Sequence, residues 1–335
     1  MKKNIFANIR LTESEKIQLR LDQKKFEEQI QELERQVIHP EEGFFGPESM
    51  TWKIYREPGI VLGGLRALFL QIAHPAVAEG VHLFSNFHEE YLYRAHRTFT
   101  SMATFYYGNT EQALKTARRL FKMHSMIRGQ VERRIKGHLT KVSFCAKDPE
   151  LLTWVLATLV ETSIEMYEKM HRPLSQSEAE QFFEESKIIA TLMGIPLDLY
   201  PKNLDAFYNY YYEMIEGDQL HVGPTTLALS KIILHPPYAS HRFFRWIAGG
   251  FLPEKFTQAY QVVLSTPEKK YLHLIIKVTR FLINKCPQVI RYAPPYHQAI
   301  HRIRKAQGKS SFSLGGFYDC LGKAIYLPPK FRPLL

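Results

Sequence analysis

The spacing of apolar residues is the feature of this sequence that most constrains its fold. Apolar side chains recur at three- and four-residue intervals along almost the whole chain of 335 residues, and no segment shows the sustained alternation that strands need. The pattern predicts an all-α protein. Hydrophobic residues make up 45% of the chain and aromatic residues 13%, which suits a large apolar interior able to hold a flat cofactor or an apolar ligand.

The longest apolar stretch, residues 60–81, contains Arg66, His74 and Pro75. Because proline fits the first turn of a helix but not its interior, we predict two consecutive core helices here, and not one membrane span. They cover residues 60–73 and 75–84 and meet at His74, which we interpret as a helix-junction residue.

Capping signals place the other helices. Asn109 and Gln112 form a capping-box pattern that begins a helix, and Gly129 marks its end. The predicted helices are 89–107, 110–128, 148–170, 175–193, 204–217, 224–234, 253–264 and 267–284. On the third of these, a polar stripe is interpreted as a solvated face; it consists of Thr158, Glu161, Thr162 and Glu165.

The N-terminal region predicts a separate charged helix over residues 12–38, followed by a linker rich in glycine and proline. Apolar residues follow a 3-4 spacing along this helix at Leu19, Phe26, Ile30, Leu33 and Val37. Such a stripe packs on the body or pairs with another helix, so we expect a docking contact or a homodimer through it. The predicted division is 1–50, a main helical domain at 51–305, and a basic tail at 306–335.

The net charge of +11 is concentrated near the C-terminus, where seven lysine and arginine residues face one aspartate between residues 301 and 335. The motifs of nucleic-acid-binding proteins are absent from the sequence, so no nucleic-acid partner is expected. The basic tail favours a peripheral contact with an anionic membrane.

The cysteines and the N-terminal sequence indicate a cytoplasmic protein. Cys145, Cys286 and Cys320 are widely spaced and form no CxxC motif, which favours a reducing compartment. The N-terminal sequence lacks the apolar run of a signal peptide.

Two neighbouring helices carry the residues that could perform chemistry. His124 lies on the apolar stripe of the helix at 110–128, together with Ala113, Ala117, Leu120 and Phe121. An inward histidine is either a hydrogen-bonded core residue or an axial ligand of haem iron. On the preceding helix, Arg94 and Thr98 share one face, and Arg97 points about a quarter-turn away. They form either a solvated surface or a fixed guanidinium and hydroxyl beside a cofactor.

Five stretches of the sequence carry a family resemblance. They are LGGLRALFLQIAHPAVAEGVHLFSNF (62–87), YLYRAHRT (91–98), FYYGNTEQALKTARRLFKMHSMIRGQ (105–130), CAKDPELLTWVLATLVET (145–162) and RYAPPYHQAIHRIR (291–304). In this order they resemble the oxygenase family of the latex-clearing (rubber) proteins and the fungal mycophenolic-acid side-chain oxygenase. The resemblance spans roughly residues 50–305.

The resemblance implies one b-type haem in a globin-like helical core. By the family pattern His124 would be the axial iron ligand, and Arg94 and Thr98 would match the Arg-x-x-x-Thr motif near the haem. Arg97 stands where latex-clearing proteins have a lysine implicated as distal ligand, and an arginine cannot be deprotonated to bind iron in that way. Glu79 is the candidate distal acid or base. The implied reaction is oxygenation of an apolar, isoprenoid or lipid-like molecule by O₂.

Two other interpretations stay open. One is a helical binding protein that has lost the cofactor and carries a lipid or a partner helix. The other is a di-iron oxidase, because Glu79-x-x-His82 and Glu168-x-x-His171 have the spacing of ligand pairs in di-iron helical bundles.

Overall fold

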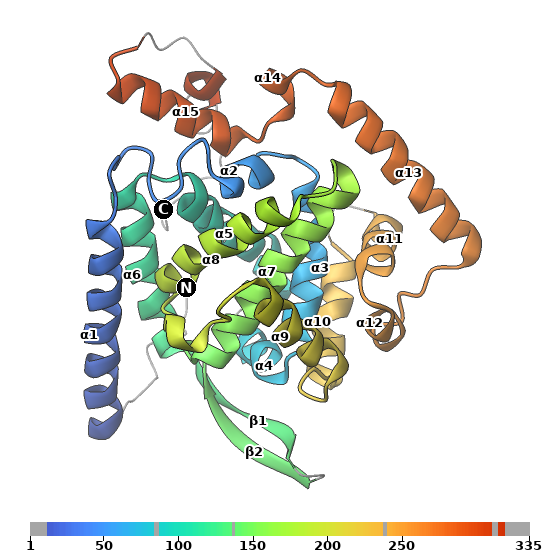
Figure 1. Cartoon of the computed structure of the whole chain (residues 1–335). Coiled ribbons are helices and arrows are strands. Elements are labelled where there is room, and N and C mark those ends of the chain that lie inside the picture. Colours follow the sequence, from blue (N-terminus) through green and yellow to red (C-terminus); the bar gives the residue numbers. More distant parts are fainter. Residues whose placement is uncertain (1–11, 84–86, 136–137, 237–239, 310–313, 319–335) are drawn as a thin grey trace.

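A computed structural model describes residues 12–83, 87–135, 138–236, 240–309 and 314–318, and the side chains of 87–94 and 133–139 also lie outside the described part. The chain is mostly helical, as predicted (Figure 1). The helices of the N-terminal half are α1 (Glu13–Arg35), α2 (Met50–Tyr55), α3 (Ile60–Ile72), α4 (Pro75–Leu83), α5 (Phe87–Tyr107), α6 (Thr110–Met126) and α7 (Pro149–Met170). Those that follow are α8 (Gln176–Met193), η1 (Leu197–Leu199), α9 (Leu204–Glu216), α10 (Pro224–Leu234), α11 (His241–Phe251), α12 (Glu254–Ala259), α13 (Thr266–Lys285), α14 (Gln288–Arg291) and α15 (Pro294–Ala306).

A β-hairpin corrects the prediction that residues 110–128 form one helix ended by Gly129. Helix α6 ends at Met126, and Gly129 lies in strand β1 (Arg128–Ile135), which pairs antiparallel with β2 (His138–Cys145). The hairpin extends away from the helices (Figure 1). Among the hairpin side chains that the structure describes, only Val131 and Phe144 at its base are buried, which gives no alternating apolar face along the described part of the strands.

The predicted helix at 253–264 is also shorter in the structure. Helix α12 ends at Ala259, and Gln261 adopts a left-handed conformation with φ 58°. The amide of Val262 then donates to the carbonyl of Thr257, which closes the helix end as a left-handed C-terminal cap does.

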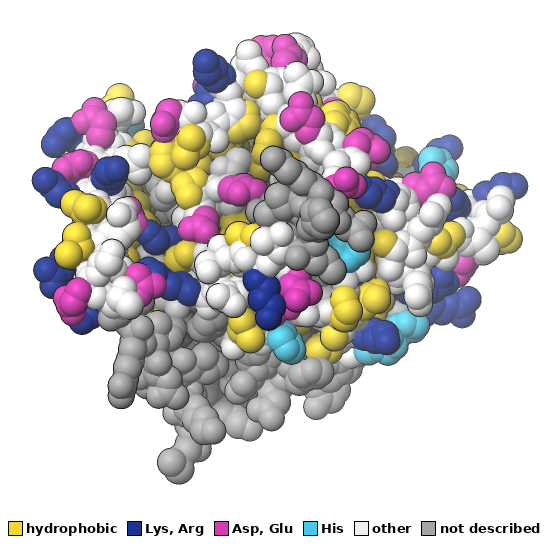
Figure 2. All heavy atoms as spheres, turned by 90° about the horizontal axis from the view of Figure 1, so that it is seen from below, with side chains coloured by type: hydrophobic (Ala, Val, Ile, Leu, Met, Phe, Trp, Pro, Cys, Tyr) yellow, Lys and Arg dark blue, Asp and Glu magenta, His cyan; other side chains and the backbone are white. Residues whose placement is uncertain are grey.

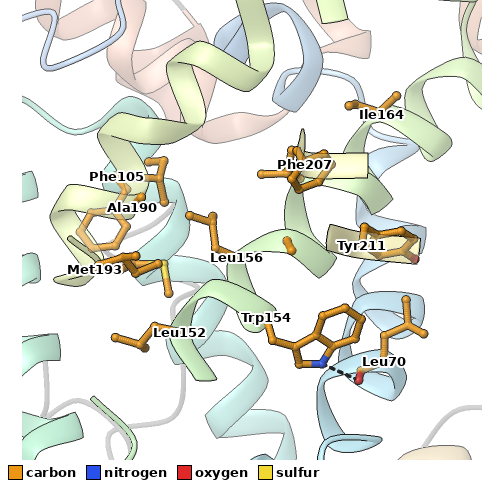
Figure 3. Close-up of a cluster of buried hydrophobic side chains, with 14 of the residues drawn as sticks. Leu70, Phe105, Leu152, Trp154, Leu156, Ile164, Ala190, Met193, Phe207 and Tyr211 are labelled. Atoms are coloured by element: carbon orange, nitrogen blue, oxygen red, sulfur yellow. Dashed lines mark hydrogen bonds between the residues drawn. The ribbon is translucent and has the colours of Figure 1, made fainter. Parts of the chain in front are cut away.

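Helices α3 and α7 form an antiparallel pair through the centre of the molecule. A Cβ added at Gly63 would lie 2.6 Å from atoms of Met166 and Thr162, so glycine permits the close approach of the two helices. Towards the other end, the indole of Trp154 donates to the carbonyl of Leu70 (Figure 3). Around α7 the core is filled by aromatic and aliphatic side chains such as Phe207.

The polar stripe of α7 is buried, so its interpretation as a solvated face is wrong. Thr158, Glu161 and Thr162 are at most 9% exposed, and only Glu165 is half-buried, in an ion pair with Lys169. The stripe faces α3, whose own polar residues meet it. Sequence periodicity locates a polar stripe but cannot show that a second helix supplies partners for it.

Arg66 of α3 is the main partner. Its guanidinium forms a bidentate pair with Glu161, and it also donates to Thr162 at 2.6 Å, to Tyr211 at 3.2 Å and to the carbonyl of Phe251 at 2.8 Å. Burial lowers the pKa of Arg66, but the charge and hydrogen bonds of Glu161 outweigh burial and raise it. Arg66 therefore keeps its charge inside the protein.

The C-terminal end of α3 is held by donors from four other segments. The carbonyl of Phe69 accepts from the hydroxyl of Tyr260 (2.7 Å), that of Leu70 from Trp154 (3.1 Å), that of Ile72 from the hydroxyl of Thr226 (3.0 Å), and that of Ala73 from the amide of His221 (2.7 Å). Phe69 already accepts from the amide of Ala73, so Tyr260 is its second donor. The later carbonyls lie in the last turn, where a helix offers no partners, and the tertiary structure supplies their donors.

The junction after α3 confirms the predicted pair of helices. His74 is fully buried, its carbonyl accepts from the amide of Ala78, and α4 begins at Pro75. The bend between the helices is 102°. Among the described residues, no single helix combines the length and the apolar composition of a membrane span; α3 and α4 reach both only when they are counted together.

Helix α1 packs on the body through two residues of its predicted stripe. Phe26 and Ile30 are buried, and the ring of Phe26 stacks on that of Phe121 with centroids 4.4 Å apart. Of the two roles expected for this helix, packing on the body is therefore observed, and a homodimer through it stays a prediction. The predicted membrane-binding tail lies mostly outside the described residues.

Candidate functional site

Helices α5 and α6 bring the predicted haem residues side by side. The guanidinium of Arg97 lies 3.8 Å from the sulfur of Met123, and that of Arg119 lies 3.4 Å from the hydroxyl of Ser101. From the first contact to the second, the residue number rises by four on α5 and falls by four on α6, so the two helices are antiparallel. The turn of α5 at residues 97–98 thus lies beside the turn of α6 that carries His124.

His124 occupies the last turn of α6, on the stripe that the sequence predicts to face inward. Ala113 and Ala117 of this stripe are fully buried. The imidazole of His124 is half-buried with its Nδ1 atom inaccessible to solvent, and the backbone carbonyl of His124 accepts from the amide of Ile127 at 3.2 Å. A partly buried imidazole on a well-packed helix is a suitable metal ligand.

Cys145, at the end of β2, contacts the C-terminal end of α6. Its sulfur lies 3.6 Å from the carbonyl of His124. Burial raises the pKa of the Cys145 thiol, and the neighbouring Asp148 adds to this effect, so the group stays protonated at neutral pH. Cys145 therefore acts here as a weak hydrogen-bond donor to the end of α6 and not as a thiolate ligand.

The structure describes only part of the Arg-x-x-x-Thr motif on α5. Arg97 and Thr98 are exposed, and the backbone of Arg94 belongs to α5 one turn earlier, whereas the side chain of Arg94 lies outside the described residues. The roles of these three residues near a cofactor stay predictions. What the structure gives is their place on the helix adjacent to the one that carries His124.

Glu79 lies on α4, which passes the end of α6. A Cβ added at its neighbour Gly80 would lie 3.6 Å from the side chain of Ile127, the residue that follows α6. The carboxylate of Glu79 is half-buried and accepts a 2.5 Å hydrogen bond from the hydroxyl of Thr225. Helix α10, which begins at Pro224, contacts both α4 and α5.

Thr225 was missed by the sequence analysis. Pro224 marks the start of α10 in the sequence, but the contact joins two residues 146 positions apart, and no local pattern predicts it. The candidate site therefore draws on four helices linked by the contacts of α5 with α6 and of α10 with α4 and α5. They carry Glu79, Arg97, Thr98, His124 and Thr225.

The two Glu-x-x-His pairs are not brought together. The carboxylate of Glu168 accepts from the amide of Leu174, and His171 contacts Asn284 at 2.6 Å, both at the end of α7 that faces the start of α3. Glu79 and His82 follow the opposite end of α3, and His82 is exposed. A helix of 13 residues, about 20 Å long, separates the pairs. Within the part of the chain that the structure describes, no three histidine, cysteine or acidic residues form a metal-binding group.

Comparisons with known proteins add a family match. The model of the family described as "ER-bound oxygenase mpaB/B'/Rubber oxygenase, catalytic domain" matches residues 52–282. The uncharacterized proteins Rv2237 of Mycobacterium tuberculosis and Mb2261 of Mycobacterium bovis are each 25% identical over 234 residues, which cover 64% of this chain and 84% of theirs. No solved structure matches.

Proposed function

The chain belongs to the family of the ER-bound oxygenases mpaB and B' and the rubber oxygenases, and on this premise we propose that it is a haem b-dependent oxygenase acting with O₂ on an apolar, isoprenoid or lipid-like substrate. The family supports an oxidoreductase of the oxygenase type. The observation that carries the finer proposal is the position of His124 beside the Arg97–Thr98 turn and close to α4, which bears Glu79.

The donor set of this region fits a haem better than an iron ion bound by protein ligands alone. A porphyrin supplies four nitrogen ligands, so one imidazole from the protein is enough to hold the iron. His124 offers such an imidazole, and the arginines of α5 offer cations for the carboxylates of a haem. When bound, the haem would supply the oxygen-activating chemistry.

The residues of the chain have distinct roles in this proposal. The packed stripe of α6 holds His124 in a fixed orientation, because Ala113 and Ala117 anchor the helix in the core. Glu79 would hold or accept a proton at its carboxylate, where Thr225 fixes one oxygen by a hydrogen bond. Arg97 stays charged and serves as a positioning group, not as an exchangeable iron ligand.

The first experiment is the visible spectrum of the purified chain, expressed with a supplied haem precursor. We expect a Soret band in the wild type and its loss in His124→Ala, because one imidazole holds the iron. His82→Ala is the matched control, since this histidine is exposed on α4 and belongs to a di-iron pair; it should keep the band.

Two results would contradict the proposal. A colourless wild type carrying extractable apolar ligand would indicate the cofactor-free binding protein. About two non-haem irons per chain, lost in His82→Ala and kept in His124→Ala, would indicate the di-iron oxidase.

A further inference from the structure

Helix α13 lies on the outside of the molecule, along the edge opposite to α1 (Figure 1). Its inner side contacts α7 and α11. Ile276 and Ile283 pack on the cluster that contains Met166 and Phe251, and Leu272 lies against Gly250 of α11. Leu272 is the one residue of the helix that is fully buried. Most of the surface of α13 is therefore turned to solvent.

A second apolar stripe on α13 is largely exposed to solvent. Its exposed fractions range from 36% to 62%, and its members are Tyr271, Leu274, Ile275, Val278, Phe281 and Leu282. At about 100° per residue they occupy an arc of roughly 120°, the width of the buried face of an ordinary surface helix. Val289 and Ile290 on α14, the next element, are 59% and 72% exposed.

Basic residues fill the arc between the inner side and this stripe. They are Lys269, Lys270, Lys277 and Arg280. The one acidic residue of the helix, Glu268, is already bound to Arg245, to the indole of Trp246 and to Ser265. Lysine and arginine side chains are frequent along the right-hand edge of Figure 2, the side on which Figure 1 places α13.

Aromatic side chains with polar tips border the stripe. The rings of Trp246 on α11 and Tyr271 on α13 meet edge to face with centroids 5.4 Å apart, and the guanidinium of Arg242 lies 5.4 Å from the Trp246 ring. Tryptophan and tyrosine prefer the boundary between hydrocarbon and water, because one end of each ring system is apolar and the other forms hydrogen bonds.

From these observations we propose that the α13 face, defined as the six stripe residues and the four basic residues, binds the surface of an anionic lipid bilayer. The helix lies in the plane of the membrane, with the stripe at the acyl boundary and the basic residues among the headgroups. A second copy of the chain is the weaker occupant, because pairing the two stripes would bring the basic arcs of both copies close together. The contact does not require a bound haem, and it is distinct from any contact by the C-terminal tail.

The test is sedimentation of the full chain with vesicles. Vesicles of phosphatidylcholine mixed with phosphatidylserine should bind the wild type, and vesicles of phosphatidylcholine alone should bind it much less. The variant Leu274→Gln/Phe281→Gln should weaken binding about tenfold or more through lost apolar burial. The variant Lys269→Gln/Lys270→Gln/Lys277→Gln should weaken it about fivefold per charge removed, and added salt should reproduce that loss.

The matched control is Leu21→Gln on α1, since Leu21 is also an exposed apolar residue, at 50%. It should bind as the wild type does, and circular dichroism should show all variants folded. Equal binding of Leu21→Gln and Leu274→Gln/Phe281→Gln would overturn the proposal. The face would instead be assigned to a second copy by two results together. The wild type would form a dimer in lipid-free solution and fail to bind vesicles, and Leu274→Gln/Phe281→Gln would be a monomer.

Discussion

Helices α7 and α13 are similar in length, at 22 and 20 residues, yet their surroundings are opposite. In α7 fifteen residues are buried, whereas in α13 only Leu272 is. Helix α7 is the more apolar of the two, but hydropathy does not explain the whole difference, because Glu161 of α7 is inside and Phe281 of α13 is 62% exposed. A polar side chain is buried where partners meet its hydrogen-bonding groups, and an apolar one stays outside where nothing covers it.

The largest change in stability is expected when the buried carboxylate of α7 is removed. Glu161→Ala should lower the free energy of unfolding by about 3–5 kcal/mol, because Arg66 would remain buried without its counter-charge. Urea unfolding measures the change.

The matched control is Glu165→Ala, one turn further along α7. Glu165 pairs with Lys169 at the surface, with side-chain exposures of 35% and 41%, so the cost should be no more than about 1 kcal/mol. Equal costs for both variants would mean that the α3–α7 contact does not depend on its ion pair.

A smaller effect is expected where α7 donates a single hydrogen bond. Trp154→Phe keeps most of the ring but leaves the buried carbonyl of Leu70 without its side-chain donor, which should cost about 1–3 kcal/mol in urea unfolding. Trp246→Phe on α11 is the control, since its indole donates to Glu268 in a half-buried position and should cost about 1 kcal/mol or less. A neutral Trp154→Phe would contradict the role given to this bond.

The smallest effect concerns His171, where the end of α7 contacts α13 through Asn284. Burial lowers the pKa of His171 in the folded chain, and Arg291 and Arg172 lower it further, although Asn284 and Glu57 oppose this. The unfolded chain therefore binds more protons just below the ordinary histidine pKa of about 6.5, so this group makes the fold less stable as the pH falls through that region. His171→Gln should reduce the loss of unfolding free energy between about pH 7.5 and 5. An unchanged pH dependence would exclude His171 as its source.

Local signals in the sequence located many helices correctly. The capping box at Asn109 and the prolines at positions 75 and 149 begin helices where the sequence predicts them, and the helices predicted from 175 and 224 are also observed. These signals work because caps and N-terminal prolines act on backbone groups within one turn. Helix α11 was not predicted, and its first turn has no side-chain cap at Ser240.

Contacts between distant segments set the limit of prediction for the core and for the site. The burial of Glu161 depends on Arg66, 95 residues earlier, and the hydrogen bond to Glu79 comes from Thr225, 146 residues later. The sequence therefore predicted that His124 lies on the inward face of its helix, but it could not show that α4 passes the end of that helix or that α10 contacts α4.

The donors at the end of α3 are synthesised long after the helix itself. The carbonyl of Phe69, which already accepts from the amide of Ala73, receives its second donor from Tyr260, 191 residues later in the chain. At ribosomal rates of about 5–20 residues per second, the delay is about 10–40 s. Until Tyr260 has been synthesised, the end of α3 can gain its contacts with α7 but lacks one of the donors that hold it in the folded chain.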